Sequence, residues 1–306
     1  MNPPNSLLVL LALLLFNSTR AALGPFMTTV QAASAGPQDL TTWTFMPIDV
    51  PGADWTYARD MNPAAQIVGE YWKWAADTQR GFLLSDGVFT DLEVGEYSGA
   101  RGINIQGDIV GWYCCCDGFV GFLLRRGSAT PIIYPGADYT VAEGINAAGD
   151  VVGFYGLGGT EHGFLLRDGV PTTIDYPGAF ATNARGINSE GDIVGLYTNN
   201  DDPEKWWLGP FHGFVLKRDG TFTSVDYPGS GNANTNGIGE AGQVVGEYVA
   251  ADGRNYGFLL QGSEFTSFSY PGASITRPWR ITPNGQYIVG FYDDLHGFVL
   301  GRKPLK

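Results

Sequence analysis

The chain has 306 residues, a formal net charge of −13, 44 glycines and an aromatic content of 13%. Glycine at about twice its usual share excludes helical bundles and coiled coils, because each interior glycine costs a helix about 1 kcal/mol relative to alanine. The hydrophobic content excludes a disordered chain, and an acidic chain without a basic patch is not expected to bind nucleic acid. An all-β, turn-rich globular protein remains.

The N-terminal segment differs from the rest of the chain. Ser6–Phe16 is an apolar run of eleven residues, shorter than the roughly 20 that a membrane span needs and typical of a secretory signal. Ala33–Ala35 supplies an A-x-A cleavage site, and a cut after Ala21 is a shorter alternative. We predict a signal peptide at 1–35 and a linker at 36–40. An uncleaved anchor is the other interpretation, but our prediction is a secreted protein, extracellular or periplasmic, with no membrane span after cleavage.

Three sequence blocks then recur along the chain. They read ARGINSEGDIVGLY at Ala184–Tyr197, HGFLLRDG at His162–Gly169 and IDYPG at Ile174–Gly178. The glycine that follows valine in the first block can be used to measure the period, and it lies at Gly69, Gly111, Gly153, Gly195, Gly246 and Gly290. The intervals are 42, 42, 42, 51 and 44 residues, and the long one contains the insert Asn199–Pro210. Six copies at about 40–45 residues match the four-stranded blades of a β-propeller.

Each repeat divides into four short strands. The first block supplies two of them, the GFLL segment supplies the third, and the fourth ends at Tyr-Pro-Gly, where the missing N–H of proline is harmless. The chain begins with a fourth-type strand, Thr41–Val50, and ends after a third-type strand, Gly297–Leu300. A closed ring in which the N-terminal strand completes the C-terminal blade removes both unpaired ends, whereas a solenoid would be capped. We predict one six-bladed propeller domain over residues 41–306.

The H-G-F-L-L, Y-P-G-A and G-I-N-x-x-G-D-I-V-G segments resemble the HAF-repeat family of probable extracellular repeat proteins. The resemblance covers essentially the whole repeat region. It implies a secreted or surface-exposed bacterial protein, and it supplies no catalytic motif. The chain departs from the family pattern in having glycine as the second letter of the HAF block throughout, and in lacking Pro-Gly in the second repeat, at Gly95-Glu96.

The loops between the second and third strands vary freely, while the turns at the other end of each blade are short. In a propeller these loops share one face with the connections between blades, and variable loops on a rigid scaffold are the usual place for recognition. Large aromatic side chains gather there: Trp55, Trp72, Trp74, Tyr139, Trp206, Trp207 and Trp279. We predict that they form a face that stacks on sugar rings. The alternative is that the rings pack the loops onto the blades.

A second candidate site lies at the mouth of the central channel. The residue before the repeated glycine of the inner strand is, in successive repeats, Arg59, Arg101, Glu143, Arg185, Asn236 and Trp279. The next position is glycine in four repeats and Asp60 or Arg280 in the two that ring closure makes neighbours, so we predict that these two residues pair. The arginines are ligand-binding candidates, and a carbohydrate-active enzyme would use Asp60 and Glu143 as its paired carboxylates. A structural ion pair is the alternative.

No motif indicates a cofactor or a metal site. The three cysteines are adjacent, at Cys114–Cys116, so a disulfide framework is excluded, and a vicinal disulfide, an intermolecular disulfide or free thiols are possible. His162, His212 and His296 occupy one repeat slot, which predicts a repeated structural hydrogen bond rather than metal binding. The acidic insert Asn199–Pro210 lacks the DxDxDG pattern of a calcium loop and is interpreted as a solvated loop.

These observations favour a secreted binding or interaction module. Its expected partner is a glycan or a surface protein, and we expect a monomer with no cofactor, no metal and no nucleic-acid partner. An extracellular hydrolase or lyase acting on carbohydrate is the first alternative, and a structural surface protein is the second.

Overall fold

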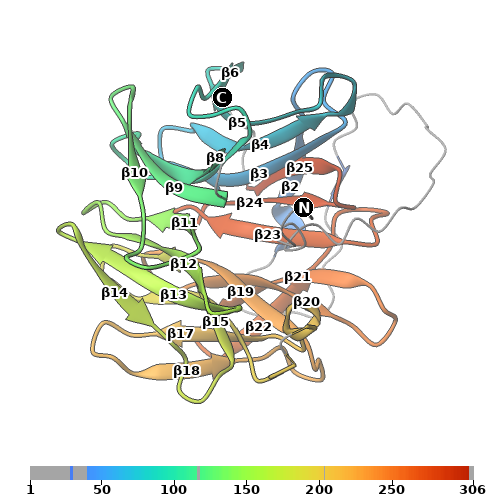
Figure 1. Ribbon diagram of the computed structural model, residues 1–306. Coiled ribbons are helices and arrows are strands. Elements are labelled where there is room, and N and C mark those ends of the chain that lie inside the picture. Colours follow the sequence, from blue (N-terminus) through green and yellow to red (C-terminus); the bar gives the residue numbers. More distant parts are fainter. Residues whose placement is uncertain (1–27, 30–39, 116–117, 203, 303–306) are drawn as a thin grey trace.

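The computed structural model describes residues 28–29, 40–115, 118–202 and 204–302. Over these residues it is an all-β protein of six antiparallel sheets arranged as the blades of a β-propeller, as predicted (Figure 1). Inner strands such as β11, β19 and β23 lie toward the middle of the view. Three short 3-10 helices lie outside the sheets: η1 (Leu40–Thr42), η2 (Trp74–Ala76) and η3 (Trp206–Leu208). The predicted signal peptide and linker fall outside the described residues, except for Thr28–Thr29 and Leu40.

Blades 1 to 5 each have four strands in sequence order from the channel outward. Blades 1 and 2 consist of β3 (Trp55–Met61), β4 (Ile67–Lys73), β5 (Thr78–Ser85) and β6 (Val88–Asp91), then β7 (Ser98–Ile103), β8 (Ile109–Cys115), β9 (Gly118–Arg125) and β10 (Ser128–Ile132). Blades 3 and 4 consist of β11 (Tyr139–Ile145), β12 (Val151–Leu157), β13 (Thr160–Arg167) and β14 (Val170–Ile174), then β15 (Ala181–Ile187), β16 (Ile193–Thr198), β17 (His212–Leu216) and β18 (Phe222–Val225). Blade 5 consists of β19 (Ala233–Ile238), β20 (Val244–Val249), β21 (Asn255–Gln261) and β22 (Glu264–Phe268).

Blade 6 contains both ends of the described chain. Its inner strands are β23 (Thr276–Ile281), β24 (Tyr287–Tyr292) and β25 (His296–Gly301), and its outer strand is β2 (Thr44–Ile48). β2 pairs with β25 in antiparallel register from Thr44 opposite Gly301 to Ile48 opposite Gly297. A two-residue strand, β1 (Thr28–Thr29), adds to the outer edge of β2. The N-terminal strand therefore closes the ring by completing the last blade.

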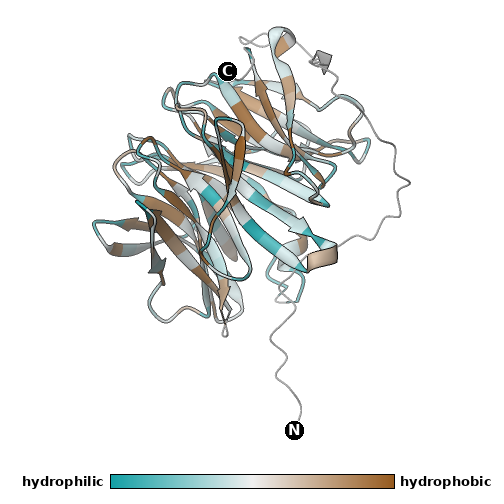
Figure 2. Cartoon of the chain, turned by 90° about the horizontal axis from the view of Figure 1, so that it is seen from above, coloured by the Kyte–Doolittle hydropathy of each residue, from teal (hydrophilic) through white to brown (hydrophobic). Residues whose placement is uncertain are grey.

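The core lies between adjacent blades. The phenylalanine of each Gly-Phe pair is at most 1% exposed in all six blades: Phe82, Phe122, Phe164, Phe214, Phe258 and Phe298. A Cβ on Gly69, in the second strand of blade 1, would lie 2.0 Å from the Tyr57 carbonyl oxygen and 2.8 Å from the Phe82 ring. The repeated Val-Gly therefore exists because backbone and ring already fill that space. Hydrophobic segments gather on the strands in Figure 2.

Every inner strand carries a β-bulge at the same slot. The pairing register shifts between Ala58 and Asp60, Ala100 and Gly102, Ala142 and Gly144, Ala184 and Gly186, Thr235 and Gly237, and Pro278 and Arg280. A bulge sets two residues of one strand opposite one residue of its partner and re-aims their side chains. The bulged residue is the first channel-mouth position predicted from the sequence, and the residue after it is the second.

Aromatic stacking links neighbouring blades toward the outside of the ring. The tyrosine of a Tyr-Pro-Gly segment stacks on the second-strand tyrosine of the next blade at 3.6–3.7 Å between ring centroids: Tyr134 on Tyr155, Tyr176 on Tyr197, Tyr227 on Tyr248, and Tyr270 on Tyr292. The three histidines lie beside these tyrosines, and each places Nδ1 2.8–3.3 Å from an aspartate that precedes such a segment or its equivalent: Asp175, Asp226 and Asp49. The predicted repeated hydrogen bond of histidine is confirmed.

A belt of asparagines links the blades at the opposite end of the inner strands. In the Gly-Ile-Asn motif, Asn146 accepts hydrogen bonds from the backbone N–H groups of Ala148 and Asp150, and its Nδ2 donates to the Asn188 carbonyl of the next blade at 3.1 Å. Asn62 and Asn104 make the same inter-blade bond. The belt stops at blade 4, because the next repeat has Gly239 in this slot and Asn188 Nδ2 has no partner among the described residues.

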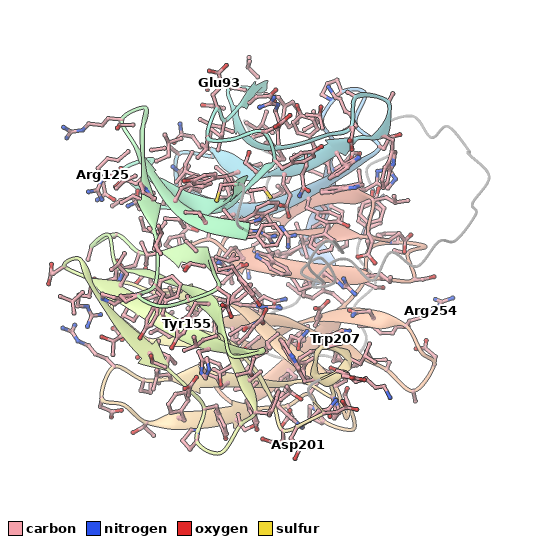
Figure 3. The ribbon with its side chains drawn as sticks, viewed as in Figure 1. Glu93, Arg125, Tyr155, Asp201, Trp207 and Arg254 are labelled. Carbon is pink, nitrogen blue, oxygen red and sulfur yellow. The ribbon has the colours of Figure 1, made fainter. Side chains whose placement is uncertain are left out.

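The two sets of connections project from opposite ends of the ring. In Figure 3, Arg125 at the end of β9 lies at the left edge and Arg254 in the β20–β21 loop at the right edge. We call the end with the short turns and the asparagine belt the turn face, and the end with the variable loops the mouth face. Among the described residues, no helix is long and apolar enough to span a membrane.

Candidate functional site at the channel mouth

The floor of the site is Arg280, which reaches from blade 6 across the channel. Its guanidinium donates hydrogen bonds to the carbonyl oxygens of Glu143, Arg185 and Asn236, in blades 3, 4 and 5, each at 2.5 Å. Its Nε lies 3.9 Å from Oδ2 of Asp60 in blade 1. The predicted Asp60–Arg280 pair is therefore present. Because one side chain joins four other blades, it blocks the channel axis at this level.

Asp60 is buried beside this floor and engaged by backbone. Its Oδ1 accepts from the Met61 N–H at 2.8 Å and its Oδ2 from the Ile103 N–H at 3.0 Å. Burial raises the pKa of Asp60 to about 6, and the charge of Arg280 and the two N–H groups oppose that rise. Both oxygens of Asp60 are engaged where blades 1, 2 and 6 meet. The geometry therefore fits the alternative that Asp60 belongs to a structural ion pair.

Above the floor, Arg59 is locked by a carboxylate and by aromatic rings. Its Nε and Nη2 donate to Oε1 of Glu70 at 3.0 and 2.5 Å, and its guanidinium carbon lies 4.1 Å from the centroid of the Trp279 ring. Burial lowers the pKa of Arg59 to about 10. Burial alone would raise the pKa of Glu70, but Arg101 and Arg59 hold it below its ordinary value. Arg59 and Glu70 therefore form a charged, buried pair.

Arg101 and Arg185 are less fully engaged. Arg101 makes no hydrogen bond within the described residues; its Nη2 lies 3.3 Å from Oε1 of Glu70 and its Nη1 lies 3.9 Å from Oε1 of Glu143. Arg185 Nη1 donates to Oδ1 of Asn236 at 2.5 Å, and its guanidinium lies 4.9 Å from the Trp279 centroid. The Arg101 side chain is 15% exposed. Solvent therefore reaches this part of the cluster.

Several buried polar atoms around these arginines have no hydrogen-bond partner in the described part of the chain. The donors are Arg59 Nη1, Arg101 Nε and the indole Nε1 atoms of Trp72, Trp112 and Trp279, and the acceptors are Glu143 Oε2, Asn183 Oδ1 and Asn234 Oδ1. Arg277 Nε and Glu247 Oε2 also lack a hydrogen bond, but they form an ion pair with each other at 3.0 Å and are not counted in this set. Leaving such a group unpaired costs about 1–3 kcal/mol, so a ligand or ordered water is needed to explain them. We call Arg59, Glu70, Arg101, Trp112, Glu143, Arg185 and Trp279 the channel-mouth cluster.

A glycine brings two members of this cluster together. A Cβ on Gly99, in the inner strand of blade 2, would lie 2.1 Å from Oε2 of Glu70 and 2.7 Å from Nε1 of Trp112. The missing side chain thus makes room for an acceptor and a donor from two neighbouring blades. Close by in the next blade, Tyr139 donates to Oε1 of Glu161 at 2.6 Å, and burial raises the pKa of Glu161.

A continuous array of aromatic rings leads into the cluster. From Trp74 it passes to Trp72 at 5.5 Å between centroids, to Trp55 at 6.3 Å, and then to Tyr57 at 4.3 Å. Tyr57 stacks at 4.2 Å on Phe291, which contacts Trp279 at 5.8 Å. Trp74 is 53% exposed, whereas Trp55 and Trp279 are 9% and 7% exposed. The array therefore runs from the surface of blade 1 to the interior between blades 1 and 6.

The structure separates the predicted aromatic residues into two groups. Trp206 and Trp207 belong to the insert of blade 4, across the ring from blade 1, and do not join the array. Trp206 is 7% exposed, whereas Trp207 is 48% exposed. Trp55, Trp206 and Trp279 are buried, which fits the alternative that these rings pack loops and blades. The candidates that do come together are Trp55, Arg59, Trp72, Trp74, Arg101, Glu143, Arg185, Trp279 and Arg280.

Sequence reasoning missed Glu70, Trp112 and Glu247, which share one repeat slot. They occupy the x position of the Val-Gly-x-Tyr segment in the second strand. Each lies opposite an inner-strand residue one step nearer the mouth face than the bulge, as Glu70 lies opposite Tyr57. This slot varies while its neighbours repeat, and that variation is the signal that could have identified it.

The acidic insert and the adjacent cysteines lie outside the channel-mouth cluster. In the acidic insert, Asn200 Nδ2 donates to the carbonyls of Lys205 and Gly209, so this side chain organises the loop. Within the described ranges, no group of three or more His, Cys, Asp or Glu is arranged to hold a metal ion. Cys114 and Cys115 are exposed at the end of β8, and Cys116 lies outside the described residues, so the alternatives for these thiols stay as predicted from the sequence.

Two surface hollows of the described residues lie away from the channel mouth. One, of about 550 Å³, is lined by Arg80, Asp91, Glu93, Gly95 and Glu96. The other, of about 680 Å³, lies on the turn face beside Asn104, Asp108 and Arg125. Neither includes a residue of the channel-mouth cluster, and neither contains an unpartnered buried side-chain atom. Shape alone therefore does not mark them as sites.

Comparison with known proteins supports the fold. No protein-family model and no curated protein sequence matches the chain. Similar solved structures include a gluconolactonase from Xanthomonas campestris, with a TM-score of 0.57 and 11% identity over 91% of this chain and 98% of that one. TolB from Acinetobacter baumannii has a TM-score of 0.58 and 10% identity over 77% and 63%. Virginiamycin B lyase from Staphylococcus aureus has a TM-score of 0.51 and 11% identity over 85% and 99%. At these identities the similarity shows the propeller fold alone, and membership of the HAF-repeat family stays a prediction.

Proposed function

We propose that this propeller is a binding module that takes a polyhydroxylated, sugar-like ligand at its channel mouth. One observation carries the proposal. Eight buried polar atoms without partners, five donors and three acceptors, gather around the arginines and the indole rings of this region. A group of hydroxyls satisfies such a mixed set, because each hydroxyl both donates and accepts.

The aromatic array supplies the apolar part of the proposed site. Trp72 is half-buried and Trp74 exposed at its outer end, so their rings offer faces on which the C–H side of a sugar can lie. Binding sites typically combine aromatic walls with a few placed polar groups, and indole rings contribute both an apolar face and an N–H donor. The proposal therefore moves the predicted glycan contact from the scattered loop tryptophans to blade 1 and the channel mouth.

An enzymatic role would require a different use of the carboxylates. Asp60 has both oxygens bonded to backbone, whereas Glu143 has Oε2 unpartnered. We therefore assign Asp60 to the scaffold and Glu143 to ligand binding. Glu143→Gln is expected to weaken binding while no product forms from bound glycans with either protein; glycan cleavage by the native protein and its loss in the variant would favour the hydrolase or lyase instead.

Where the protein acts is also part of the proposal. The apolar run Ser6–Phe16 and the A-x-A site support secretion with binding outside the cytoplasm. We propose that the secreted protein is a monomer. N-terminal sequencing of the exported protein tests the cleavage position. A start at Gly36 is expected, and a start at Ala22 would support the shorter alternative.

The binding test compares two tryptophans on opposite sides of the ring. Trp72→Ala removes a ring and an unpartnered N–H donor next to the site, and we expect it to weaken retention on a glycan array about three- to tenfold. Trp207→Ala removes a more exposed ring outside the site and is expected to have no effect. The proposal fails if the native protein retains no glycan, or if Trp207→Ala is the variant that loses binding.

A further inference from the structure

We propose that the ligand is an acidic sugar, whose carboxylate is bound by Arg101 and Arg185 while a hydroxyl donates to Glu143. The inference rests on the proposed function and deepens it by naming the ligand class, a hexuronic acid or an oligomer of one. It comes from how the positive charge at the channel mouth is matched, not from any similarity to another protein.

The acidic chain concentrates arginines at its axis. Of only 18 lysines and arginines in a protein of net charge −13, five arginines meet here. Three of them have carboxylate partners: Arg59 with Glu70, Arg280 with Asp60, and Arg277 with Glu247 and Asp294. Removing a charge from water is costly unless it is paired. Structural pairing accounts for these three and leaves Arg101 and Arg185.

Neither remaining arginine has a carboxylate of its own. The nearest oxygen to Arg101 is Oε1 of Glu70, at 3.3 Å, which already accepts two hydrogen bonds from Arg59. Arg185 makes no ion pair within 4.0 Å in the described residues and is held by the neutral side chain of Asn236. Guanidinium groups bind carboxylates through parallel N–H donors. Both residues are thus positioned by the protein but lack the partner that their chemistry favours.

One carboxylate of the protein lies between them in the ring. Glu143 is in blade 3, Arg101 in blade 2 and Arg185 in blade 4, and Glu143 is 3.9 Å from Arg101. The next acid, Glu161, bonds to Tyr139, and burial favours its neutral form by raising its pKa. Arg101 and Arg185 therefore have between them one carboxylate, Glu143, that is not hydrogen-bonded to another arginine, and a ligand carboxylate would supply a second.

The unpartnered atoms lead to the same class. Donors outnumber acceptors five to three, and two of the donors belong to guanidinium groups. A carboxylate is an acceptor only, with about four lone-pair sites, so it satisfies the surplus of donors. The three acceptors then require hydroxyl donors from the same molecule, and Glu143 Oε2 is the one that lies next to the arginines. A sugar acid combines these two groups, whereas a neutral sugar supplies no acceptor-only group for the guanidinium donors.

Carboxyl methylation provides the direct test, because it removes the charge and keeps the sugar. Binding of oligomers of glucuronate, galacturonate, mannuronate and guluronate is measured by calorimetry beside their methyl esters, neutral hexose oligomers and sulfated hexose oligomers. A hydrogen bond to a charged group contributes about tenfold or more to affinity. We expect at least one uronate to bind tenfold or more tightly than its ester and than the sulfated oligomer.

Arginine variants locate that preference. Arg101→Gln and Arg185→Gln are expected to reduce the acid-to-ester ratio to within about threefold while binding of the ester persists. Arg101→Lys, which keeps the charge, retains part of the ratio, and Arg125→Gln on the turn face leaves it unchanged. Thermal unfolding verifies that each variant is folded. If a variant does not fold, the comparison of acid with ester on the native protein still tests the proposal.

Each result decides between the two proposals. Equal binding of neutral, esterified and acidic sugars, or a preference for the sulfated oligomer, overturns the inference and leaves the proposed function intact. A preference for acid that survives both glutamine substitutions also overturns it. If no sugar of any kind binds, the proposed function fails and the inference fails with it.

Discussion

The turn face and the mouth face are built from the same six repeats but treat their buried polar groups differently. On the turn face the asparagines of blades 1, 2 and 3 repeat one arrangement, in which the side chain bonds to its own turn and to the next blade. On the mouth face the equivalent slots hold arginine, glutamate, asparagine or tryptophan, and the eight buried atoms named around the arginines have no hydrogen-bond partner among the described residues. Where the repeats keep one residue type in a slot, its buried polar atoms have hydrogen-bond partners. Where the residue type varies between blades, buried polar atoms are left without partners.

The exceptions on the turn face follow the same rule. Asn188 Nδ2 and Gln243 Oε1 have no partner among the described residues. Asn188 faces the blade whose repeat has Gly239 in place of the asparagine, and the Gln243 amide lies beside Gly239 and beside Gly285 of blade 6. Between blades 4 and 5, Ser189 hydrogen-bonds through its backbone N–H and its hydroxyl to the Glu240 carboxylate instead. Loss of one asparagine from the motif thus leaves a buried polar atom without a hydrogen-bond partner on the turn face as well. The mouth face differs in that nearly every blade departs from its neighbours.

The largest effect is expected where the two faces meet, at Arg280. Arg280→Met removes hydrogen bonds to four backbone carbonyls and leaves Asp60 buried without its counter-charge. Breaking such a buried pair typically costs about 3–5 kcal/mol of unfolding free energy. Urea denaturation measures the loss. Adding Asp60→Asn to this variant is expected to recover part of it. Arg125→Met removes an exposed ion pair with Asp108 and serves as the control, with a loss below about 1 kcal/mol. Equal losses would contradict the floor role of Arg280.

Asp60 itself gives the next effect, as a pH dependence. Its pKa is about 6 in the fold against 3.8 ordinarily, so the folded state holds the proton more tightly and stability falls as pH rises from about 4 through 6. The difference in unfolding free energy between the native protein and Asp60→Asn should change by up to roughly 3 kcal/mol over this range. Parallel curves of stability against pH would show that the buried carboxyl is not the cause.

Substitution of two asparagines tests whether the inter-blade hydrogen bonds of the belt stabilise the ring. Asn146→Ala removes two turn bonds and one inter-blade bond and is expected to cost about 2 kcal/mol. Asn188→Ala is the matched control, because its Nδ2 has no partner and only its bond from the Asp192 N–H is lost, at about 1 kcal/mol. Denaturation of both variants under one condition makes the comparison. A larger cost at Asn188 would mean that the inter-blade bonds do not support the ring.

The smallest effect is expected at the exposed histidine pairs. The hydrogen bond to Asp49 raises the pKa of His296, so its contribution is complete below the ordinary value of 6.5 and is lost as pH rises through the higher value in the fold. His296→Gln should lower stability by less than about 1 kcal/mol at pH 5 and by almost nothing at pH 9. Thermal melts at the two pH values test this, and a deficit that grows toward pH 9 would be the wrong sign.

The scaffold was predictable from the sequence because its signals repeat. Gly69 and its equivalents indicate the period, and the unmatched strand at Thr41–Val50 indicates the ring. The shared slot of His162 and its equivalents indicates a repeated hydrogen bond, whose aspartate partner only the structure identifies. Even the Asp60–Arg280 pair follows, because each residue breaks a glycine slot and ring closure makes their blades neighbours. In each case the local pattern fixes the position without knowledge of packing.

The site was only partly predictable because it depends on register and burial. Trp55 was placed in a loop, but β3 begins at this residue and buries the ring against Tyr57 and Trp72. Trp279 is the bulged residue of β23, and a bulge at this slot has no signal in residue type. Glu70 comes next to Arg59 only through cross-strand pairing. The sequence indicates which residues are able to bind a ligand, but it does not indicate which side chains lie next to them in the fold.

The indole N–H groups test most directly whether the divergent mouth face is the binding site. Two-dimensional ¹H–¹⁵N spectra resolve the tryptophan indoles, and single Trp→Phe variants assign them. Titration with uronate oligomers and their neutral counterparts should shift the unpartnered indoles of Trp72, Trp112 and Trp279, while those of Trp206 and Trp207 stay in place. Shifts confined to Trp206 and Trp207, or no shift at any indole, would contradict the account.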